Sequence, residues 1–241
     1  MDAMARPRKS RSAEAPPARR RLPVRRILLR VVLGLIAAVL AVTLLYKIVN
    51  PPTTPYMFAE GRRLGGVAQD WVPMSAIAPV MARSVVAAED ANFCLHWGLD
   101  VTAIRAALAA GGDRGASTIS QQVVKNVYLW QGRNWTRKAL EAVWTPLTEA
   151  LWSKRRILEI YLNVAEFGRG VFGVQAAARH YFGVDAGDLT PVQAARLAMV
   201  LPDPKGRDAA NPTTSQRRRS ASILDGAATI RADGRAACFE S

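Results

Sequence analysis

The sequence predicts a mainly α-helical domain preceded by one transmembrane helix. Residues 27–46 form an almost uninterrupted apolar run, and beyond Pro55 apolar residues recur at three- and four-residue steps. No stretch alternates convincingly as a β-strand would, although we allow for a short hairpin over residues 62–72. About 190 of the 241 residues remain after the first fifty, which is enough for one well-buried domain.

The first 26 residues hold half of the positive charge of the chain. They carry nine Lys and Arg against two acids, a net of +7 out of +14. Because this segment is rich in Pro, Arg and Ala and poor in apolar residues, we expect a disordered tail. Basic residues that precede a membrane span stay on the cytoplasmic side, so residues 1–26 are predicted to be cytoplasmic.

The apolar run is long enough to cross a bilayer at roughly 1.5 Å per residue. Tyr46 and Lys47 give it an interfacial border, and the Pro51-Pro52 pair ends the helix. Because no A-x-A cleavage site follows, residues 27–49 are predicted to be an uncleaved, single-pass signal anchor. Residues 50–241 then form the external domain. A buried core helix is the alternative interpretation of the apolar run.

The first helix of the domain is expected to begin after Ser75 and to end at Glu89, with Pro79 in its first turn. Its apolar residues at helical steps are Ile77, Met81, Val85 and Ala88. Asp100 can cap a second helix, Val101–Ala110, which a glycine pair ends.

Capping signals predict four further helix starts. These lie at Thr118, near Thr136, at Ser153 and at Thr190. Capping-box spacing supports the first through Gln121 and the last through Gln193. The helix from Thr136 carries an apolar stripe and is expected to kink at Pro146. The stripe consists of Leu140, Val143, Leu147 and Leu151. A glycine cluster breaks the chain at residues 168–173, and the last predicted helix runs to Pro202.

The composition excludes several classes of protein. Two cysteines, Cys94 and Cys238, are too few for a disulfide framework or a zinc site, and a single bond between them is left open. With two histidines and no clustered ligands, no transition-metal site is predicted. Nucleic acid is not an expected partner, because the topology explains the basic tail and no interleaved aromatic and basic platform occurs.

Glu89 is the leading candidate for a catalytic base. It ends a largely apolar helix, where burial and the negative end of the helix dipole both raise the pKa of a carboxyl group. A carboxylate in that position can take a proton from a sugar hydroxyl. The alternative interpretation is that Glu89 and Asp90 are ordinary solvated acids at a helix end.

The segment from Gly115 to Asn126 is a candidate anion site. A Gly-led helix start with the hydroxyls of Ser117 and Thr118 offers free backbone N–H groups, which is the usual basis of anion binding. Lys125 follows one turn beyond Gln121. In the alternative interpretation, the serine and threonine residues only cap the helix.

Three cations, Arg133, Arg137 and Lys138, lie close to Glu141 in the sequence. A charge run of this kind is usually a solvated helix face. Transfer of a sugar from a pyrophosphate carrier, however, needs a base for the attacking hydroxyl and cations for the leaving group, and it needs no carboxylic acid. One buried Glu with Lys and Arg around an anion site fits that demand better than the two carboxylates of a glycosidase.

Five segments, in order, resemble the motifs of the monofunctional peptidoglycan glycosyltransferases. They are E-D-A-N-F-C-L-H-W-G, G-A-S-T-I-S-Q-Q, R-K-A-L-E, R-I-L-E-I-Y-L-N and G-V-F-G-V-Q-A-A-A. The second motif is usually written Gly-Gly-Ser-Thr-x-Thr-Gln-Gln. Ala116 and Ser120 depart from it, but both are small and Ser120 keeps the hydroxyl. The resemblance covers residues 64–230, almost the whole external domain.

The resemblance implies roles for individual residues. Glu89 would be the catalytic base, and Glu141 the second essential glutamate, which positions the donor or organises charge and metal beside it. The implied substrate-binding residues are Ser117, Thr118, Gln121, Gln122, Lys125, Asn126, Arg133, Arg137 and Lys138. No residue is assigned as a metal ligand, and no cofactor is required, although a divalent cation, Mg²⁺ or Mn²⁺, is left open.

The resemblance also implies a fold and an activity. The fold would be a lysozyme-like helical domain with a membrane-dipping lobe, to which Val101–Ala110 belongs unless it is a plain core helix. The activity would be polymerisation of lipid II into β-1,4-linked glycan strands, with inversion and release of undecaprenyl pyrophosphate, for cell wall synthesis. The partners would be lipid II, the growing strand and the inner membrane, with the domain in the periplasm. Cell-division or elongation proteins are left open.

Two rival functions remain from the sequence. A lytic transglycosylase cleaves the same polymer with one glutamate, but it has no need of the cations at Lys125 and Arg133. A non-catalytic, membrane-anchored envelope protein is the other rival. Because no S-x-x-K motif occurs, the resemblance is to members without a transpeptidase.

Overall fold

The computed structural model describes residues 24–109, 111, 117–132 and 134–240, and the chain divides into two compact units, Met1–Val42 and Thr43–Ser241. The helices are α1 Val24–Tyr46, α2 Pro55–Leu64, α3 Pro79–Glu89, α4 Val101–Ala109, α5 Ile119–Tyr128, α6 Trp135–Leu151, α7 Lys154–Val164, α8 Val174–Phe182, α9 Pro191–Val200, α10 Thr214–Ala232 and α11 Ala237–Glu240. The strands are β1 Ala68–Gln69, β2 Glu166–Gly168 and β3 Val171–Phe172, and the short 3-10 helices are η1 Met74–Ala76, η2 Phe93–Leu95 and η3 Ala186–Asp188. The prediction of a mainly α-helical chain is confirmed.

The helix α1 makes up the whole of the described part of the first unit and ends at Tyr46, within the second. Its 23 residues span about 34 Å at the usual rise of an α-helix. Most of its large apolar side chains are exposed, which is costly in water and favourable in a bilayer. Among the described residues it is the one helix long and apolar enough to cross a membrane, and it fits a single-pass anchor.

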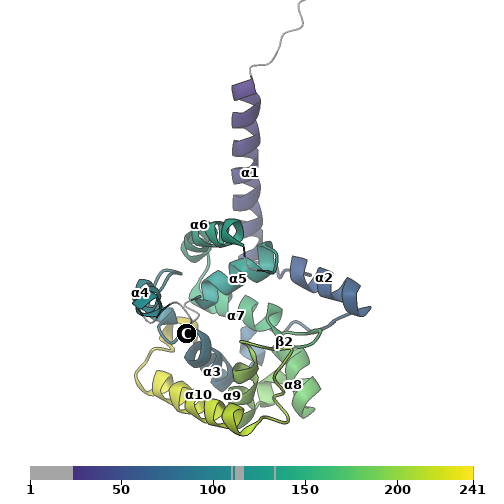
Figure 1. Cartoon of the computed structure of the whole chain (residues 1–241), viewed down its shortest axis with the longest axis vertical. Coiled ribbons are helices and arrows are strands. Elements are labelled where there is room, and N and C mark those ends of the chain that lie inside the picture. Colours follow the sequence, from purple (N-terminus) through teal and green to yellow (C-terminus); the bar gives the residue numbers. More distant parts are fainter. Residues whose placement is uncertain (1–23, 110, 112–116, 133, 241) are drawn as a thin grey trace, which may run out of the picture. The chain divides into compact units, whose positions relative to one another are not determined.

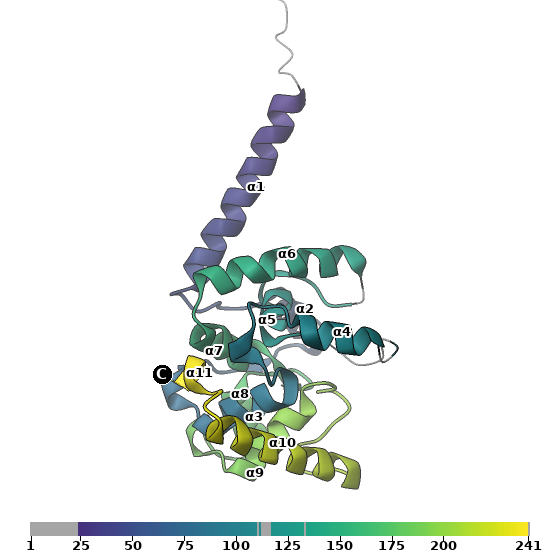
Figure 2. The same ribbon diagram turned by 90° about the vertical axis from the view of Figure 1, so that its left-hand side faces the viewer.

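The second unit is built in helical layers around one core. In both views α6 lies at one end and α9 with α10 at the other (Figures 1 and 2). Between them, α5 packs against α6 and α7, while α3 packs against α9 and α10. The fully buried side chains of Val85, Val123, Leu158 and Leu197 show that α3, α5, α7 and α9 all contribute to this core.

A small sheet replaces the hairpin that was allowed for over residues 62–72. That expectation is wrong, because residues 55–64 are helical: Thr54 caps α2 through the N–H of Met57, and Pro55 favours a helical first turn. The strand that follows, Ala68–Gln69, pairs in parallel with Val171–Phe172, and the glycine cluster forms the antiparallel turn between β2 and β3.

The predicted helix caps are mostly confirmed. Asp100 accepts from the N–H of Ala103, and Ser153 accepts from the N–H of Arg156. Thr118 and Thr190 both form complete capping boxes. The start expected after Ser75 is wrong: Ser75 lies in η1, and α3 begins at Pro79, which needs no N–H partner at a first helical position.

The first two residues of the apolar stripe of α6 point away from the core, whereas Leu151 at its end packs against it. Leu140 is 41% exposed and Val143 is 77% exposed, while Glu141, Thr145 and Thr148 are buried. In this part of the helix, polar side chains are therefore buried and apolar ones are exposed, which is the reverse of the usual pattern. Pro146 lies within it, as the sequence predicts.

The helices α10 and α11 at the end of the chain are not predicted from the sequence. Thr213 and Gln216 form a capping box at the start of α10. Gly226 brings α10 close to α3, since a Cβ atom there would lie 3.1 Å from Cβ of Ala87. The open question about the cysteines is answered, because Cys94 and Cys238 are joined by a disulfide.

Candidate active site

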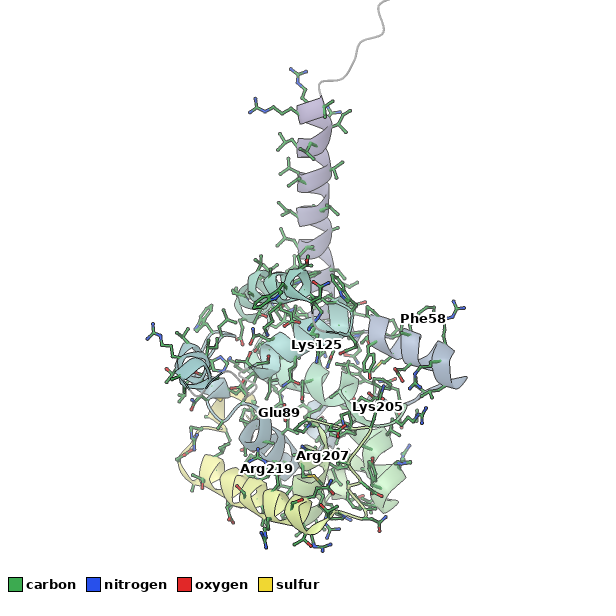
Figure 3. The ribbon with its side chains drawn as sticks, in the orientation of Figure 1. Phe58, Glu89, Lys125, Lys205, Arg207 and Arg219 are labelled. Atoms are coloured by element: carbon green, nitrogen blue, oxygen red, sulfur yellow. A yellow bond between two sulfur atoms is a disulfide. The ribbon has the colours of Figure 1, made fainter. Side chains whose placement is uncertain are left out.

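Glu89 is the last residue of α3, and its carboxylate is held by a two-step hydrogen-bond relay. Gln122 of α5 donates through Nε2 to Glu89 Oε2 at 2.8 Å. The hydroxyl of Tyr161 donates to Gln122 Oε1 at 3.1 Å. Because Tyr161 is 1% exposed and fixed in the core, it orients the amide so that the NH₂ group faces Glu89. Figure 3 labels Glu89 together with Lys125, Arg207 and Arg219.

The pKa of Glu89 is raised, chiefly because burial disfavours the charged carboxylate. The hydrogen bond from Gln122 and the positive charges of Arg219, Lys125 and Arg207 oppose that effect. These opposing effects on the pKa suit a general base. The raised pKa increases the affinity of the Glu89 carboxylate for a proton, and the nearby cations keep its ionised form accessible. The direction of the shift agrees with the expectation from the sequence.

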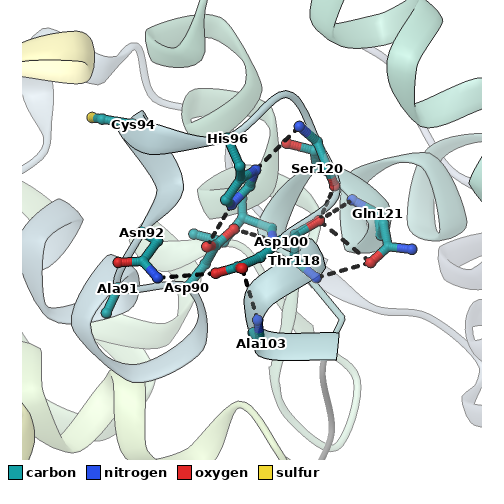
Figure 4. A network of polar contacts seen from close by, with 12 residues as sticks. Asp90, Ala91, Asn92, Cys94, His96, Asp100, Ala103, Thr118, Ser120 and Gln121 are labelled. Carbon is teal, nitrogen blue, oxygen red and sulfur yellow. Dashed lines mark hydrogen bonds and ion pairs between the residues drawn. The ribbon is translucent and has the colours of Figure 1, made fainter. Parts of the chain in front are cut away.

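The loop after Glu89 is locked by Asp90, which connects two segments far apart in the chain. Its Oδ1 lies 2.8 Å from His96 Nε2, and its Oδ2 accepts from the N–H of Ile119 at 3.0 Å (Figure 4). The N–H of Gly98 donates to His96 Nδ1, so the proton of the imidazole lies on Nε2 and is donated to Asp90. This network fixes the loop to the start of α5.

Gly98 cannot be replaced without disturbing this packing. Its φ of 81° lies in the left-handed region, and a Cβ atom would lie 2.6 Å from Thr145 Cγ2. The close approach lets Thr118 Oγ1 donate to the carbonyl of Gly98 at 2.6 Å. The loop therefore sits directly between α5 and α6.

A cationic cavity of about 180 Å³ opens at the start of α5. It is lined by Ser117, Gln121, Gln122, Lys125, Arg137, Lys138 and Glu141. The pKa of Lys125 is lowered, mainly by burial, although Glu141 and Glu89 oppose the shift. The Nε–H of Arg137 is buried and has no hydrogen-bond partner among the described residues, which leaves a donor for an anionic ligand.

Glu141 organises the cations of this cavity. It is 2% exposed, and it pairs with Arg137 through Oε1 and with Lys138 through Oε2, the latter at 3.1 Å. Lys138 also donates to Ser117 Oγ at 3.1 Å. Because both carboxylate oxygens face cations, Glu141 holds two positive side chains at the edge of the cavity.

A second cavity, of about 250 Å³, is lined by Glu89 and by the loop that follows it. Its lining residues include Glu89, Asp90, Asn92, Asp100, Ser117 and Thr118. Ser117 lines both cavities, and Gln122 connects the cationic cavity to Glu89 through its hydrogen bond. The arrangement provides two adjacent spaces with a base beside them, which is what a transfer between two bound molecules requires.

The residues predicted to bind substrate fall into three groups. Ser117, Gln121, Gln122, Lys125, Arg137 and Lys138 line the cationic cavity. Thr118 is committed to its capping box, and Asn126 accepts from Gln131 at 3.3 Å and does not line that cavity. The prediction for Arg133 lies outside the described residues.

Several residues around Glu89 escaped the sequence analysis. Tyr161 lies in the segment R-I-L-E-I-Y-L-N, to which no role in the site is assigned from the sequence, and Arg219 lies on the unpredicted α10. Glu149 accepts from Ser120 and pairs with Lys154 at 2.8 Å. The partners of Glu89 and of Ser120 are distant in sequence, so no local pattern could reveal them.

The residues of the cationic cavity do not fit a divalent cation. Within the described parts of the chain, no group of three or more His, Cys, Asp or Glu side chains could hold a metal ion. Among the described residues that line the cavity, Glu141 is the only acid, and both of its oxygens already face cations. Mg²⁺ would need several oxygen ligands and would be repelled by the positive charges.

The charge of Arg219 should shift the pH dependence that the buried carboxyl of Glu89 gives to the reaction. Its guanidinium donates to the carbonyl of Ala88 at 3.2 Å and lowers the pKa of Glu89. We expect Arg219→Gln to raise that pKa. Because the base acts in its ionised form, the acid limb of a pH profile of kcat/KM should move to higher pH. Arg219→Lys keeps the charge and should leave the limb in place; an unmoved limb in Arg219→Gln would contradict the assignment.

Comparison with known proteins identifies the family. The model of the family described as Transglycosylase matches residues 59–228. A biosynthetic peptidoglycan transglycosylase of Jannaschia sp. (strain CCS1) is 62% identical over 216 residues, which cover 90% of each chain. Proteins with the same description from Rhodospirillum centenum (strain ATCC 51521 / SW) and Caulobacter vibrioides (strain ATCC 19089 / CIP 103742 / CB 15) are 46% and 43% identical, over 87% and 89% of this chain and 93% and 96% of theirs.

The fold and the site thus define a glycosyl-transferring enzyme, and this chain belongs to the transglycosylase family. The resemblance inferred from the five sequence segments is confirmed, and so is the lysozyme-like helical fold that it implied.

Proposed function

We propose that this chain polymerises lipid II into β-1,4-linked glycan strands, with release of undecaprenyl pyrophosphate, for cell wall synthesis. The observation that carries the proposal is the position of the buried base Glu89 beside a cavity lined with cations. Membership of the transglycosylase family and the descriptions of the relatives support it.

Glu89 acts on the acceptor. The 4-hydroxyl of the acceptor GlcNAc lies in the cavity of about 250 Å³ and gives its proton to the Glu89 carboxylate. The resulting oxygen nucleophile attacks C1 of the donor MurNAc from the side opposite the leaving group. The bond from C1 to the diphosphate oxygen breaks as the new bond forms, so the anomeric centre inverts and the linkage is β-1,4.

The cationic cavity binds the leaving group. Lys125, Arg137 and Lys138 surround the diphosphate, and Ser117 provides a hydroxyl at the border of the two cavities. Positive charges that face the oxygens on which negative charge develops stabilise the transition state. Since a diphosphate is already a weak base, no carboxylic acid has to protonate it. We propose that no cofactor is required.

The cations also distinguish this proposal from cleavage of existing glycan. A glycosidase needs a carboxylic acid that protonates a sugar leaving group. The second carboxylate here, Glu141, is in ion pairs with Arg137 and Lys138, and therefore is not placed to donate a proton. A non-catalytic scaffold protein would have no need for an internal anion cavity beside a buried acid.

The outward face of α6 supports contact with the membrane that holds the substrate. The exposed residues of the helix are uncharged, and they include Trp135 at 91% and Val143 at 77% exposure. Within the larger unit, Trp144 of α6 donates through Nε1 to Thr43 at 2.9 Å. We propose that α6 forms the membrane-dipping lobe, with the anchor in the inner membrane and the domain in the periplasm.

A charge on that face should reduce activity only in a bilayer. Burying a valine side chain in an apolar phase contributes about 1.5 kcal/mol, and a carboxylate reverses the preference. We expect Val143→Asp to lower the rate of lipid II polymerisation about tenfold in proteoliposomes, and to leave the rate in detergent unchanged. Val192→Asp, an equally apolar exposed position on α9, is the matched control. Equal rates for both variants in proteoliposomes would contradict the placement of α6.

The proposed function is tested by incubating the full-length protein in detergent with labelled lipid II. Long glycan strands and undecaprenyl pyrophosphate should appear, and moenomycin, the inhibitor that the family resemblance predicts, should suppress both. Purified glycan strands are the second substrate. Release of anhydro-sugars from those strands without polymerisation of lipid II would favour a lytic enzyme, and no reaction with either substrate would refute the proposal. Cell-division or elongation proteins remain proposed partners.

A further inference from the structure

The end of the chain packs against the loop that follows Glu89. We call residues 233–240 the C-terminal strap. Within it, Arg235 donates to the carbonyl of Ala91 at 3.0 Å, and Cys238 is bonded to Cys94 in η2. The strap therefore reaches the loop at a backbone carbonyl and through a covalent bond.

Aromatic packing joins the same two segments. Phe239 of the strap and Phe93 of the loop are both 0% exposed, and their ring centroids lie 6.4 Å apart. Two further contacts fix the strap to the body of the domain: Arg155 donates to the carbonyl of Phe239 at 3.1 Å, and Arg83 pairs with Glu240 at 2.5 Å. The loop is thus pressed onto a support that is itself anchored.

The opposite side of the loop carries the geometry of the active site. Asp90 joins the loop to the first residue of α5, and His96 completes that contact (Figure 4). Glu89 directly precedes Asp90, so a displacement of the loop also displaces the base. The cationic cavity is built from α5 and α6 and has no residue in common with the strap.

We propose that the C-terminal strap is a positioning element for Glu89, and that the Cys94–Cys238 bond keeps it in place, so that reduction slows transfer without weakening donor binding. This inference rests on the proposed function for its kinetic readout. Cys94 and Cys238 act through the loop and touch neither cavity.

The bond is needed because the remaining contacts of the strap are few. The helix α11 has four residues, too short to be stable by itself. The bond joins residues separated by 144 positions, which greatly restricts the freedom of the open chain. Without it, the buried side chains of Ala236 and Phe239 and the polar contacts described above hold the strap, and such a short terminal segment opens locally more often than the core.

Reduction is a balanced thiol–disulfide exchange. A dithiol such as dithiothreitol attacks one sulfur of the bond through its thiolate, forms a mixed disulfide, and then closes to its own cyclic disulfide. Cys94 and Cys238 become thiols with the two electrons and two protons that the dithiol loses. Since the chain has only these two cysteines, no other bond in the protein responds.

The test compares oxidised and dithiothreitol-reduced full-length protein in detergent. We expect kcat for lipid II polymerisation to fall about tenfold on reduction, because a small displacement of a catalytic group is costly. The Kd for moenomycin should change less than about twofold, because the cavity of α5 and α6 is untouched. Reoxidation should restore kcat. The double variant Cys94→Ser, Cys238→Ser should have the low kcat in both conditions.

Hydrogen exchange gives a readout that does not depend on activity. The N–H groups of Phe93 and Leu95 are bonded to the carbonyls of Asp90 and Asn92, and their exchange should accelerate on reduction while that of α5 does not. Unchanged kcat together with unchanged exchange would overturn the inference. A parallel loss of moenomycin binding would also overturn it, because that result indicates general unfolding. If oxidised protein fails to polymerise lipid II, the proposed function fails, and exchange alone then decides the role of the strap.

Discussion

Glu89→Gln will lower the rate of lipid II polymerisation about 10³-fold, within the range usual for the loss of a general base. The amide has nearly the same shape as the carboxylate, but it cannot accept the proton of the acceptor hydroxyl. The hydrogen bond from Gln122 can persist if the new amide presents its oxygen to Nε2. The defect should therefore lie in kcat, with little change in KM.

The initial rate of strand formation from labelled lipid II measures this effect. The Kd for moenomycin should stay within about twofold of the wild-type value, because the cationic cavity keeps all of its cations. Asp225→Asn is the matched control, since it removes the same charge from an exposed position on α10. If Glu89→Gln polymerises lipid II at the rate of this control, Glu89 is not the base.

Local signals in the sequence were sufficient for most of the secondary structure. A cap such as Thr118 with Gln121, or Asp100 before its helix, depends on residues within one turn of each other, so the pattern in the sequence is the contact in the structure. The wrong prediction of a hairpin over residues 62–72 also depended on local signals. The cap at Thr54 and the proline after it were overlooked, so the residues of α2 were assigned to a hairpin.

The direction of α6 could not be deduced from its periodicity. A stripe of apolar residues indicates which face of a helix avoids water, but it does not say whether protein or lipid covers that face. In α6 the buried, inward-facing residues are Glu141, Thr145 and Thr148, and Glu141 lines the cationic cavity. The proposed contact with a bilayer accounts for the outward position of Val143.

The residues of the candidate site could be predicted from the sequence, but the contacts between them could not. The positions of Glu89, Lys125 and Glu141 followed from motifs, whereas their relationships depend on the fold. Gln122 lies 33 positions from Glu89, and the two cysteines are 144 positions apart. No local rule links residues at such separations, so the relay, the disulfide and the role of α10 emerge only from the packing of distant helices.

The same fold predicts the consequence of removing the central cation, Lys125. Burial lowers the pKa of Lys125, and the negative charges of Glu141 and Glu89 both oppose that shift. This lysine therefore links the leaving group to the base. Loss of one preorganised group that stabilises developing negative charge typically costs 10²–10³ in rate.

We therefore expect Lys125→Met to lower kcat/KM for lipid II about 100-fold, and to weaken moenomycin binding as well. The second effect separates this variant from Glu89→Gln, because Lys125 lines the cationic cavity and Glu89 does not. Lys205→Met is the matched control: its ammonium pairs with Glu60 at 3.0 Å, outside both cavities, and Glu60 keeps its ion pair with Arg63 when Lys205 is replaced. A Lys125→Met protein that keeps wild-type kcat/KM and Kd would show that the diphosphate binds elsewhere, and the division of the site into a base and a cationic cavity would have to be abandoned.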